Sequence, residues 1–152
     1  MNKRIKILFV LFICLNVMCQ EPIKPDWKDL NYAGNEQGYH TMDIYLPKKN
    51  KKKYPVVMTI YGSAWGRNDK KGANKIKKES LIKSGFAVVS INHRSSYDAI
   101  FPAQIHDVKA AIRFIRGNAK KFKIDTSFFG ITGISSGGHL ACLAGTTSFN
   151  KS

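Results

Sequence analysis

The sequence has no apolar run long enough to cross a bilayer as a helix. Its longest, Ile7–Met18, has 12 residues and is interrupted by Asn16, whereas a spanning helix needs about 20. Three basic residues precede this run: Lys3, Arg4 and Lys6. A basic segment before a short apolar run is typical of a signal peptide. We therefore predict a signal peptide at residues 1–19, with secretion or export to the periplasm and no stable membrane span. Lipid anchoring at Cys19 ranks second.

Cysteine is also scarce. Two of the three cysteines, Cys14 and Cys19, lie in the predicted signal peptide, so only Cys142 would remain in the mature chain. An intramolecular disulfide is thereby excluded. Because Cys142 lies in an apolar segment, we expect a buried and unreactive thiol.

Acidic residues are few, 10 against 25 lysines and arginines, and the net charge is +15, or +12 without the signal peptide. Two clusters carry much of the excess: Lys48, Lys49, Lys51, Lys52 and Lys53 in one, and Lys70, Lys71, Lys75, Lys77 and Lys78 in the other. Aromatic residues are not interleaved with them, so we expect no nucleic-acid partner. We interpret the clusters as a solvated loop and a solvated helix face. Weak binding of a polyanion, such as an acidic polysaccharide, stays open as an alternative.

Apolar segments alternate with amphipathic ones after the signal peptide. Strands are predicted at Thr41–Leu46, Pro55–Tyr61, Phe86–Ile91 and Phe128–Ile134, the last three buried, and helices at Asn68–Ser84, Ala103–Phe122 and Ser136–Gly145. Such alternation predicts an α/β fold, a three-layer αβα sandwich around a mostly parallel sheet. Residues 20–39 are assigned to a linker and a first strand region, with Glu21–Lys28 as the linker, and residues 40–152 to the domain.

Residues 133–137, GISSG, match the pattern G-x-S-x-G and stand between a predicted strand and a predicted helix. A sharp strand-to-helix turn holds the serine in a strained conformation, and small residues on both sides avoid clashes. The N-terminus of the following helix directs N–H groups toward the same place. A serine so placed is a nucleophile if a general base and oxyanion donors are present. Ser135 is therefore a candidate nucleophile, and a glycine-rich turn without chemistry is the alternative.

Four segments together resemble the N-terminal half of the α/β-hydrolases of the esterase and lipase group, close to secreted deacetylases and feruloyl esterases. They are MDIYLP (42–47), IYGSAWGRNDK (60–70), the segment that runs from INHRSS to FKID (91–125), and GISSGGHLA (133–141). In that group the corresponding features are the second strand, an H-G-G-x-W loop, Y-R-L and F-P-A segments, and G-x-S-A-G-G-H-L-A.

The resemblance implies roles for the residues of the elbow and of the loop at 62–64. Ser135 would be the nucleophile and the N–H of Ser136 one oxyanion donor. The second donor would come from the loop formed by Gly62, Ser63 and Ala64. The resemblance implies no cofactor, and no pair of residues has the spacing of metal ligands.

The resemblance also implies structural roles near the site. Trp65 would pack under the loop, and His139 would be structural. Arg94 and Asp107 would belong to the scaffold beneath the site, where we expect them to form an ion pair between a strand end and a helix.

Three positions depart from the resembled pattern: Tyr61 stands in place of His, Ser63 in place of Gly, and His93 in place of Tyr. A Cβ atom at position 63 would narrow the oxyanion hole or alter its backbone. We expect these changes to affect catalytic efficiency rather than the fold.

The sequence lacks the other members of a catalytic triad. In this fold an acidic residue and then a histidine follow the nucleophile, but no Asp or Glu follows Ser135 and the only later histidine is His139. At four residues from the serine, His139 cannot readily reach back to it. His40, His93 and His106 are interpreted as surface or structural residues. We therefore expect a truncated domain that lacks the C-terminal strands and leaves an open, apolar edge at the last strand.

These features predict a serine ester hydrolase of the carboxylesterase, acetyl-esterase or feruloyl-esterase type. It would act through an acyl-enzyme on small-molecule or polysaccharide-linked esters, and would be inactive as this chain for want of the acid and the base. The alternatives are an amide or peptide hydrolase on the same scaffold, and a non-catalytic pseudoenzyme that binds polyanions. The sequence carries no signal for an oligomeric state.

Overall fold

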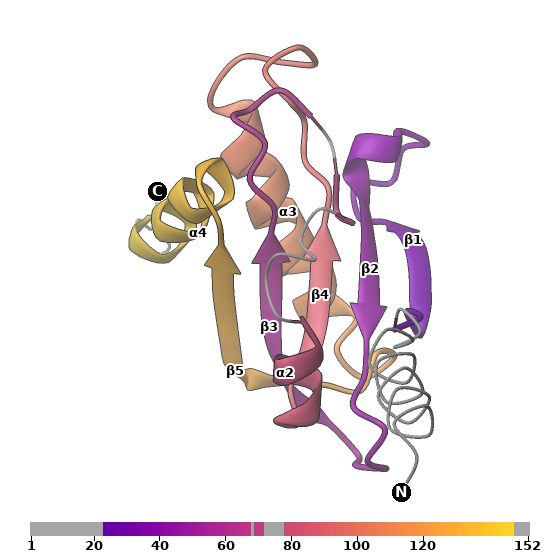
Figure 1. The fold of residues 1–152 in the computed structure, drawn as a ribbon. Helices are drawn as coiled ribbons and strands as arrows, with labels where there is room; N and C mark the ends of the chain where they lie inside the picture. Colours follow the sequence, from indigo (N-terminus) through magenta and orange to yellow (C-terminus); the bar gives the residue numbers. More distant parts are fainter. Residues whose placement is uncertain (1–22, 68, 72–77, 148–152) are drawn as a thin grey trace, which may run out of the picture.

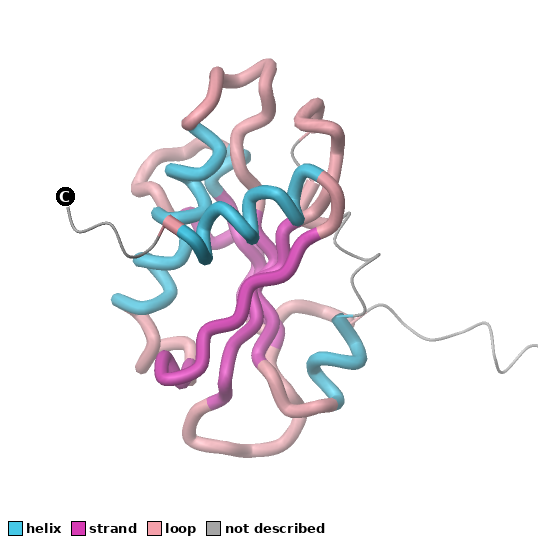
Figure 2. Tube along the Cα trace, turned by 90° about the vertical axis from the view of Figure 1, so that its left-hand side faces the viewer, coloured by secondary structure: helices cyan, strands magenta, loops and turns pink. Residues whose placement is uncertain are grey.

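A computed structural model describes residues 23–67, 69–71 and 78–147, which form a five-stranded sheet with helices on both faces (Figures 1 and 2). The elements, in chain order, are β1 (Trp27–Asn31), the short 3-10 helix η1 (Gly38–His40), β2 (Thr41–Tyr45), β3 (Tyr54–Ile60), α2 (Lys78–Lys83), β4 (Ala87–Ile91), α3 (Ala103–Gly117), β5 (Ile124–Gly133) and α4 (Ser136–Thr146). The three-layer α/β architecture is confirmed.

The strands lie in the order β1-β2-β4-β3-β5. β3 pairs in parallel with both β4 and β5, whereas β1 and β2 are antiparallel strands at one side of the sheet. Ile60, the last residue of β3, lies opposite Ile91 of β4 and Gly133 of β5. The carboxyl ends of three parallel strands therefore meet at one edge, the edge at which open α/β sheets bind ligands.

The central strands are almost wholly apolar because both of their faces are covered. One face carries the main core, in which alternate residues of β2, β3 and β4 pack against α3 and α4. Its members include Met42, Ile44, Met58, Ile60, Ile91, Val108, Ile115 and Leu140. On the other face, Val88 packs with Tyr45 and with Ile82 of α2. Two polar residues on that face, Thr59 and Ser90, are buried and joined by a hydrogen bond of 2.9 Å.

β5 differs from its prediction as a buried strand. Within the described chain it pairs only with β3, so its outer edge is open, as the sequence predicted, and most of its residues are only partly covered. Phe128 is 50% exposed. An apolar sequence does not distinguish a central strand from an edge strand, because the difference lies in whether a neighbour is present.

Three other expectations are corrected. The predicted linker Glu21–Lys28 overlaps the first strand, because β1 begins at Trp27. The helix predicted at Ala103–Phe122 ends at Gly117, and turns follow it. Cys142 is exposed rather than buried, because α4 covers the sheet with its other side, through Leu140 and Ala144.

Some predictions lie outside the described residues. These are the signal peptide at residues 1–19, which stays a prediction, and residues 68 and 72–77 of the helix predicted at Asn68–Ser84, with Lys75 and Lys77. The described residues 69–71 lie in a loop and turn instead of the predicted helix, and α2 ends at Lys83. The described helices include none with the length and apolar character that a membrane crossing requires.

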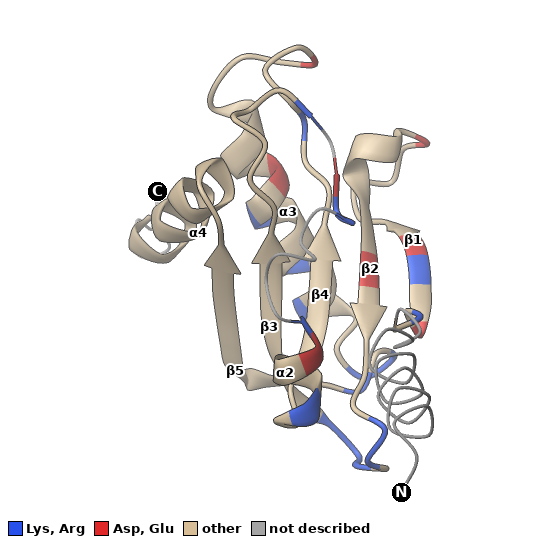
Figure 3. Cartoon of the chain, in the orientation of Figure 1, with Lys and Arg blue, Asp and Glu red and all other residues tan. Residues whose placement is uncertain are grey.

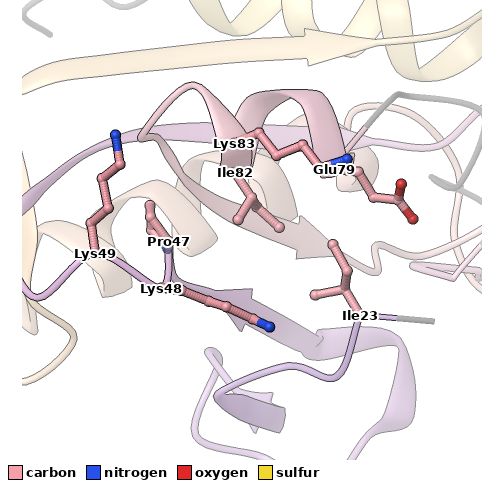
Figure 4. A pocket seen from close by; sticks show the side chains of 7 residues that line it. All are labelled: Ile23, Pro47, Lys48, Lys49, Glu79, Ile82 and Lys83. Atoms are coloured by element: carbon pink, nitrogen blue, oxygen red, sulfur yellow. The ribbon is translucent and has the colours of Figure 1, made fainter. Parts of the chain in front are cut away.

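The amino ends of the parallel strands form the opposite edge of the sheet. The five lysines of the first cluster are exposed there, in the loop between β2 and β3 (Figure 3). A cavity of about 500 Å³ lies at the same end, lined by Ile23, Pro47, Lys48, Lys49, Glu79, Ile82 and Lys83 (Figure 4). It is remote from residues 133–137, which lie at the carboxyl end of β5 and the start of α4.

Lys70 does not lie on a solvated helix face, as its cluster was interpreted. Its side chain is 5% exposed, and its Nζ atom forms ion pairs with Asp43 Oδ1 at 2.8 Å and with Asp29. The hydrogen bond from Lys70 lowers the pKa of the Asp29 carboxyl. Lys70 thus ties the segment after β3 to β1 and β2. A count of charges cannot reveal this, because the two carboxylates are distant in sequence.

Replacing Lys70 with methionine should lower the free energy of unfolding by about 3 kcal/mol, because it leaves the buried carboxylate of Asp43 without its cation. The exposed neighbour Lys71 provides the matched control, and K71M should change little. Urea denaturation of both variants checks the prediction. Equal effects of K70M and K71M would show that the buried pair does not stabilise the fold.

Candidate active site

The turn around Ser135 joins the carboxyl end of β5 to the start of α4. β5 ends at Gly133 and α4 begins at Ser136, so only two residues form the turn. Ser135 has φ 53° and ψ −124°, a positive φ that costs a non-glycine residue about 1 to 3 kcal/mol. The residue is exposed at the N-terminus of a helix. The strained strand-to-helix turn that the sequence predicted is confirmed.

Glycine is required at three positions around this turn because backbone segments touch there. A Cβ atom on Gly133 would lie 2.3 Å from the carbonyl carbon of Gly137. One on Gly137 would lie 2.3 Å from the carbonyl oxygen of Tyr61, and one on Gly62 would lie 2.3 Å from that of Ile134. These separations are too short for any side chain. The two glycines of the G-x-S-x-G pattern therefore serve packing, and the second ties the turn to the end of β3.

The loop after β3 lies against the turn. The backbone N–H of Ser63 donates a hydrogen bond to the side-chain Oγ of Ser136 at 3.1 Å. Ala64 and Trp65 both have positive φ, 49° and 67°. The loop and the first residue of α4 are thus in contact, as the resemblance implies for two sides of an oxyanion hole. The N–H of Ser63, one of the predicted donors, is already bonded to the Ser136 hydroxyl.

Trp65 and His139 pack together beside the turn. Their rings meet edge to face with centroids 5.5 Å apart, and Trp65 also packs against the main core. The expected packing role of Trp65 is confirmed. His139 lies one helical turn from Ser135, whose carbonyl oxygen accepts the N–H of His139. Its ring faces the tryptophan.

Two of the positions that depart from the resembled pattern are in contact with each other. The rings of Tyr61 and His93 are stacked, with centroids 4.9 Å apart and planes 9° apart. The hydroxyl of Tyr61 donates to the carbonyl oxygen of Arg67 at 2.6 Å, and that of Ser63 donates to the same oxygen at 3.1 Å. All three departures therefore belong to one group that braces the loop. The sequence shows them only as separate substitutions.

Burial governs the protonation of the stacked pair. It raises the pKa of Tyr61 to about 12. It lowers the pKa of His93, which is fully buried, so the imidazole is neutral at neutral pH. The Nδ1 atom of His93 donates to the carbonyl oxygen of Arg94 at 2.8 Å, and its Nε2 atom has no partner among the described residues. His93 is therefore a structural residue, as interpreted from the sequence, and is not on the surface.

Asp107 joins three elements beneath the site. Its carboxylate accepts a hydrogen bond from Arg94 Nη2 at 2.6 Å, from Arg94 Nε at 2.9 Å and from the Arg94 backbone N–H at 2.9 Å. His40 Nε2 lies 3.2 Å from the same carboxylate. These bonds raise the pKa of the Arg94 guanidinium. The predicted Arg94–Asp107 ion pair is confirmed, and His40 is an additional buried member.

A protein-family model described as BD-FAE matches residues 42–152, most of the chain. The chain belongs to the BD-FAE family. Over 93 residues it is 37% identical to the probable carboxylic ester hydrolase LipM of Mycobacterium tuberculosis, and over 90 residues it is 39% identical to the esterase LipQ of that organism. These matches cover 61% and 59% of the chain, but 22% and 21% of the relatives.

Two solved structures are similar to this chain in sequence and in fold. A bifunctional GH43-CE protein of Bacteroides eggerthii is 63% identical, with a TM-score of 0.78, over 80% of this chain and 17% of that one. A truncated form of a carbohydrate esterase from gut microbiota is 53% identical, with a TM-score of 0.79, over 85% and 46%. The fold is thus part of the α/β-hydrolase fold, and this chain spans about a fifth of the two curated relatives and less than half of that esterase.

The described part of this BD-FAE chain places no base or acid beside the serine. Ser135 Oγ has no hydrogen-bond partner among the described residues, and His40 and His93 are held elsewhere by the contacts above. His106 is exposed on α3. No group of three or more His, Cys, Asp or Glu residues in the described chain could hold a metal ion. The described residues therefore form the nucleophile turn and the adjoining loop, and Ser135 is the one member of a triad among them.

Replacing Gly133 with alanine should destabilise the BD-FAE domain by about 3 kcal/mol or prevent folding, because the added Cβ overlaps the Gly137 backbone. Gly145 provides the control, since a Cβ there meets open space in α4. G145A should raise the free energy of unfolding by up to about 1 kcal/mol through helix propensity. Urea denaturation measures both. A tolerated G133A would show that the turn is looser than described.

The neutral, buried His93 should make stability depend on pH. Because its pKa is lower in the folded than in the unfolded chain, the unfolded chain binds the proton more readily. The stability of the wild type relative to H93F should be constant above the unfolded pKa of 6.5 and should decline as the pH falls below it. Phenylalanine preserves a ring against Tyr61 but cannot titrate. Urea denaturation across this range tests the prediction, and a difference independent of pH would contradict it.

Proposed function

We propose that this chain supplies the nucleophile and the oxyanion-binding part of a serine ester hydrolase that removes acyl groups from carbohydrates. The observation that carries the proposal is the strained conformation of Ser135, at a two-residue turn that three glycines hold between β5 and α4. Such a turn exposes a serine hydroxyl at the carboxyl edge of the sheet. The names of the esterase and carbohydrate-esterase relatives support ester bonds as the target.

In the proposed reaction Ser135 Oγ attacks the ester carbonyl carbon and its proton passes to a general base. The oxygen of the tetrahedral intermediate takes the negative charge, to which the N–H of Ser136 and the N–H of Gly62 or Ala64 would donate hydrogen bonds. Collapse of the intermediate expels the alcohol, which takes up the proton. Water then hydrolyses the acyl-enzyme and releases the acid. The base and the acid of the triad would come from polypeptide outside these 152 residues, as the greater length of the relatives allows.

Acylation of Ser135 can be tested without the missing residues. The chain is incubated with p-nitrophenyl acetate in imidazole buffer, which supplies a diffusible base, and fragmentation mass spectrometry locates the acetyl group. Ser127, an exposed serine near the start of the same strand, is the internal reference. Oriented N–H donors typically contribute about 100-fold in rate, so Ser135 should be acetylated about 100 times faster than Ser127.

The variants S135A and S127A complete the test. S135A should remove the fast acetylation, and S127A should not change it. Turnover without imidazole should be negligible, because no described residue serves as the base. Acetylation of Ser135 no faster than that of Ser127 would overturn the proposal, and so would rapid turnover that survives S135A.

A further inference from the structure

Large apolar side chains are exposed mainly near the carboxyl edge of the sheet. In the described part of the chain the exposed ones are Ile23, Tyr97, Ile100, Phe101, Phe128 and Ile134. Three of these six belong to residues 95–102, SSYDAIFP, here named the aromatic loop, which connects β4 to α3. Tyr97 is 89% exposed, Ile100 84% and Phe101 63%. A fourth, Ile134, directly precedes Ser135. Apolar surface gathered in this way marks a binding site more often than scattered exposure does.

The aromatic loop lies beside the candidate active site. The backbone N–H of Ser96 donates to the carbonyl oxygen of Trp65 at 2.8 Å. The Tyr97 ring lies over Gly66, on which a Cβ atom would be 3.7 Å from Tyr97 Cε2. Trp65 also packs on His139, one helical turn after Ser135, and so links the aromatic loop to the start of α4. Figure 1 shows the aromatic loop at the same end of the molecule as the start of α4.

Polar contacts hold the aromatic loop from beneath. Gln104, which is buried, donates from Nε2 to the carbonyl oxygens of Ala99 at 2.7 Å and Ser95 at 3.3 Å. The backbone N–H and the hydroxyl of Ser95 both donate to Asp98 Oδ2 at 2.7 Å. The backbone is therefore shaped by internal bonds, while the apolar side chains face solvent. A preshaped loop loses little entropy when it binds a ligand.

We propose that the aromatic loop binds sugar rings of the acylated polysaccharide, with Tyr97 and Phe101 as stacking surfaces beside Ser135. This inference rests on the proposed function and adds the part of the substrate that is recognised. An aromatic face carries a negative quadrupole, which attracts the weakly positive C–H face of a pyranose ring, and the hydroxyl groups at the ring's rim stay in water. The aromatic loop contains no Lys or Arg and one acidic residue, Asp98. A neutral glycan chain therefore fits it better than an acidic one.

The test measures binding, so it does not depend on turnover. The full chain is titrated with unacylated xylohexaose, and the backbone amide resonances are followed by NMR. Residues 95–102 and the neighbouring 63–66 segment should shift. Y97A should weaken binding about tenfold through loss of the stacking surface, F101A should weaken it as well, and Y97F should bind like the wild type because it keeps the ring. F128A is the matched control, since Phe128 is similarly exposed but lies on β5.

Three results would overturn the inference: no shifts at millimolar xylohexaose, binding that is undiminished in both Y97A and F101A, or self-association through the aromatic loop in place of sugar binding. Thermal unfolding of each variant confirms that it is folded. The two proposals fail separately. Fast acetylation of Ser135 without xylohexaose binding would overturn only the proposal that the aromatic loop binds sugar. Tyr97-dependent binding without fast acetylation would overturn only the proposal that Ser135 is the nucleophile.

Discussion

The geometry of the site depends on a backbone contact between the ends of β3 and β5 and the start of α4, at the carboxyl edge of the sheet. The ends of β3 and β5 and the start of α4 meet with no space for a Cβ atom at Gly62, Gly133 or Gly137. Because β5 must turn into α4 within two residues against this contact, Ser135 is forced to positive φ. Its exposure and its position at a helix N-terminus follow from the same packing.

The loop after β3 is shaped by a second set of contacts. In the resembled pattern position 63 is glycine, but here Ser63 has a side chain, and Ala64 and Trp65 after it have positive φ. Two hydroxyl groups that converge on the carbonyl oxygen of Arg67, the stacked Tyr61 and His93 rings, and the bond from the Ser63 N–H to Ser136 hold the loop. The three substitutions Tyr61, Ser63 and His93 look unrelated in the sequence, but in the structure their side chains hold the same loop.

Beneath the site, buried charges join parts of the chain that are distant in sequence. Asp107 of α3 pairs with Arg94 and His40, and Lys70 forms ion pairs with Asp29 and Asp43. Such pairs stabilise a structure mainly because a lone buried charge is costly. They place the loop after β3 and the start of the aromatic loop relative to the sheet, and so connect stability to the geometry around Ser135.

Local patterns in the sequence were enough to determine the α/β class, the buried strands β3 and β4 and the turn at residues 133–137. The family resemblance placed Arg94 and Asp107 beneath the site, and their ion pair was inferred from that. Apolar runs and a glycine-serine motif are properties of neighbouring residues, which is why they could be read directly. Only the tertiary structure decided that β5 is an edge strand, that Lys70 is buried and Cys142 exposed, that Tyr61 stacks on His93, and that Tyr97 lies against Gly66 in the loop after β3. Each of these depends on which distant segment lies next to a residue, and that is a property of packing in space, which no local pattern contains.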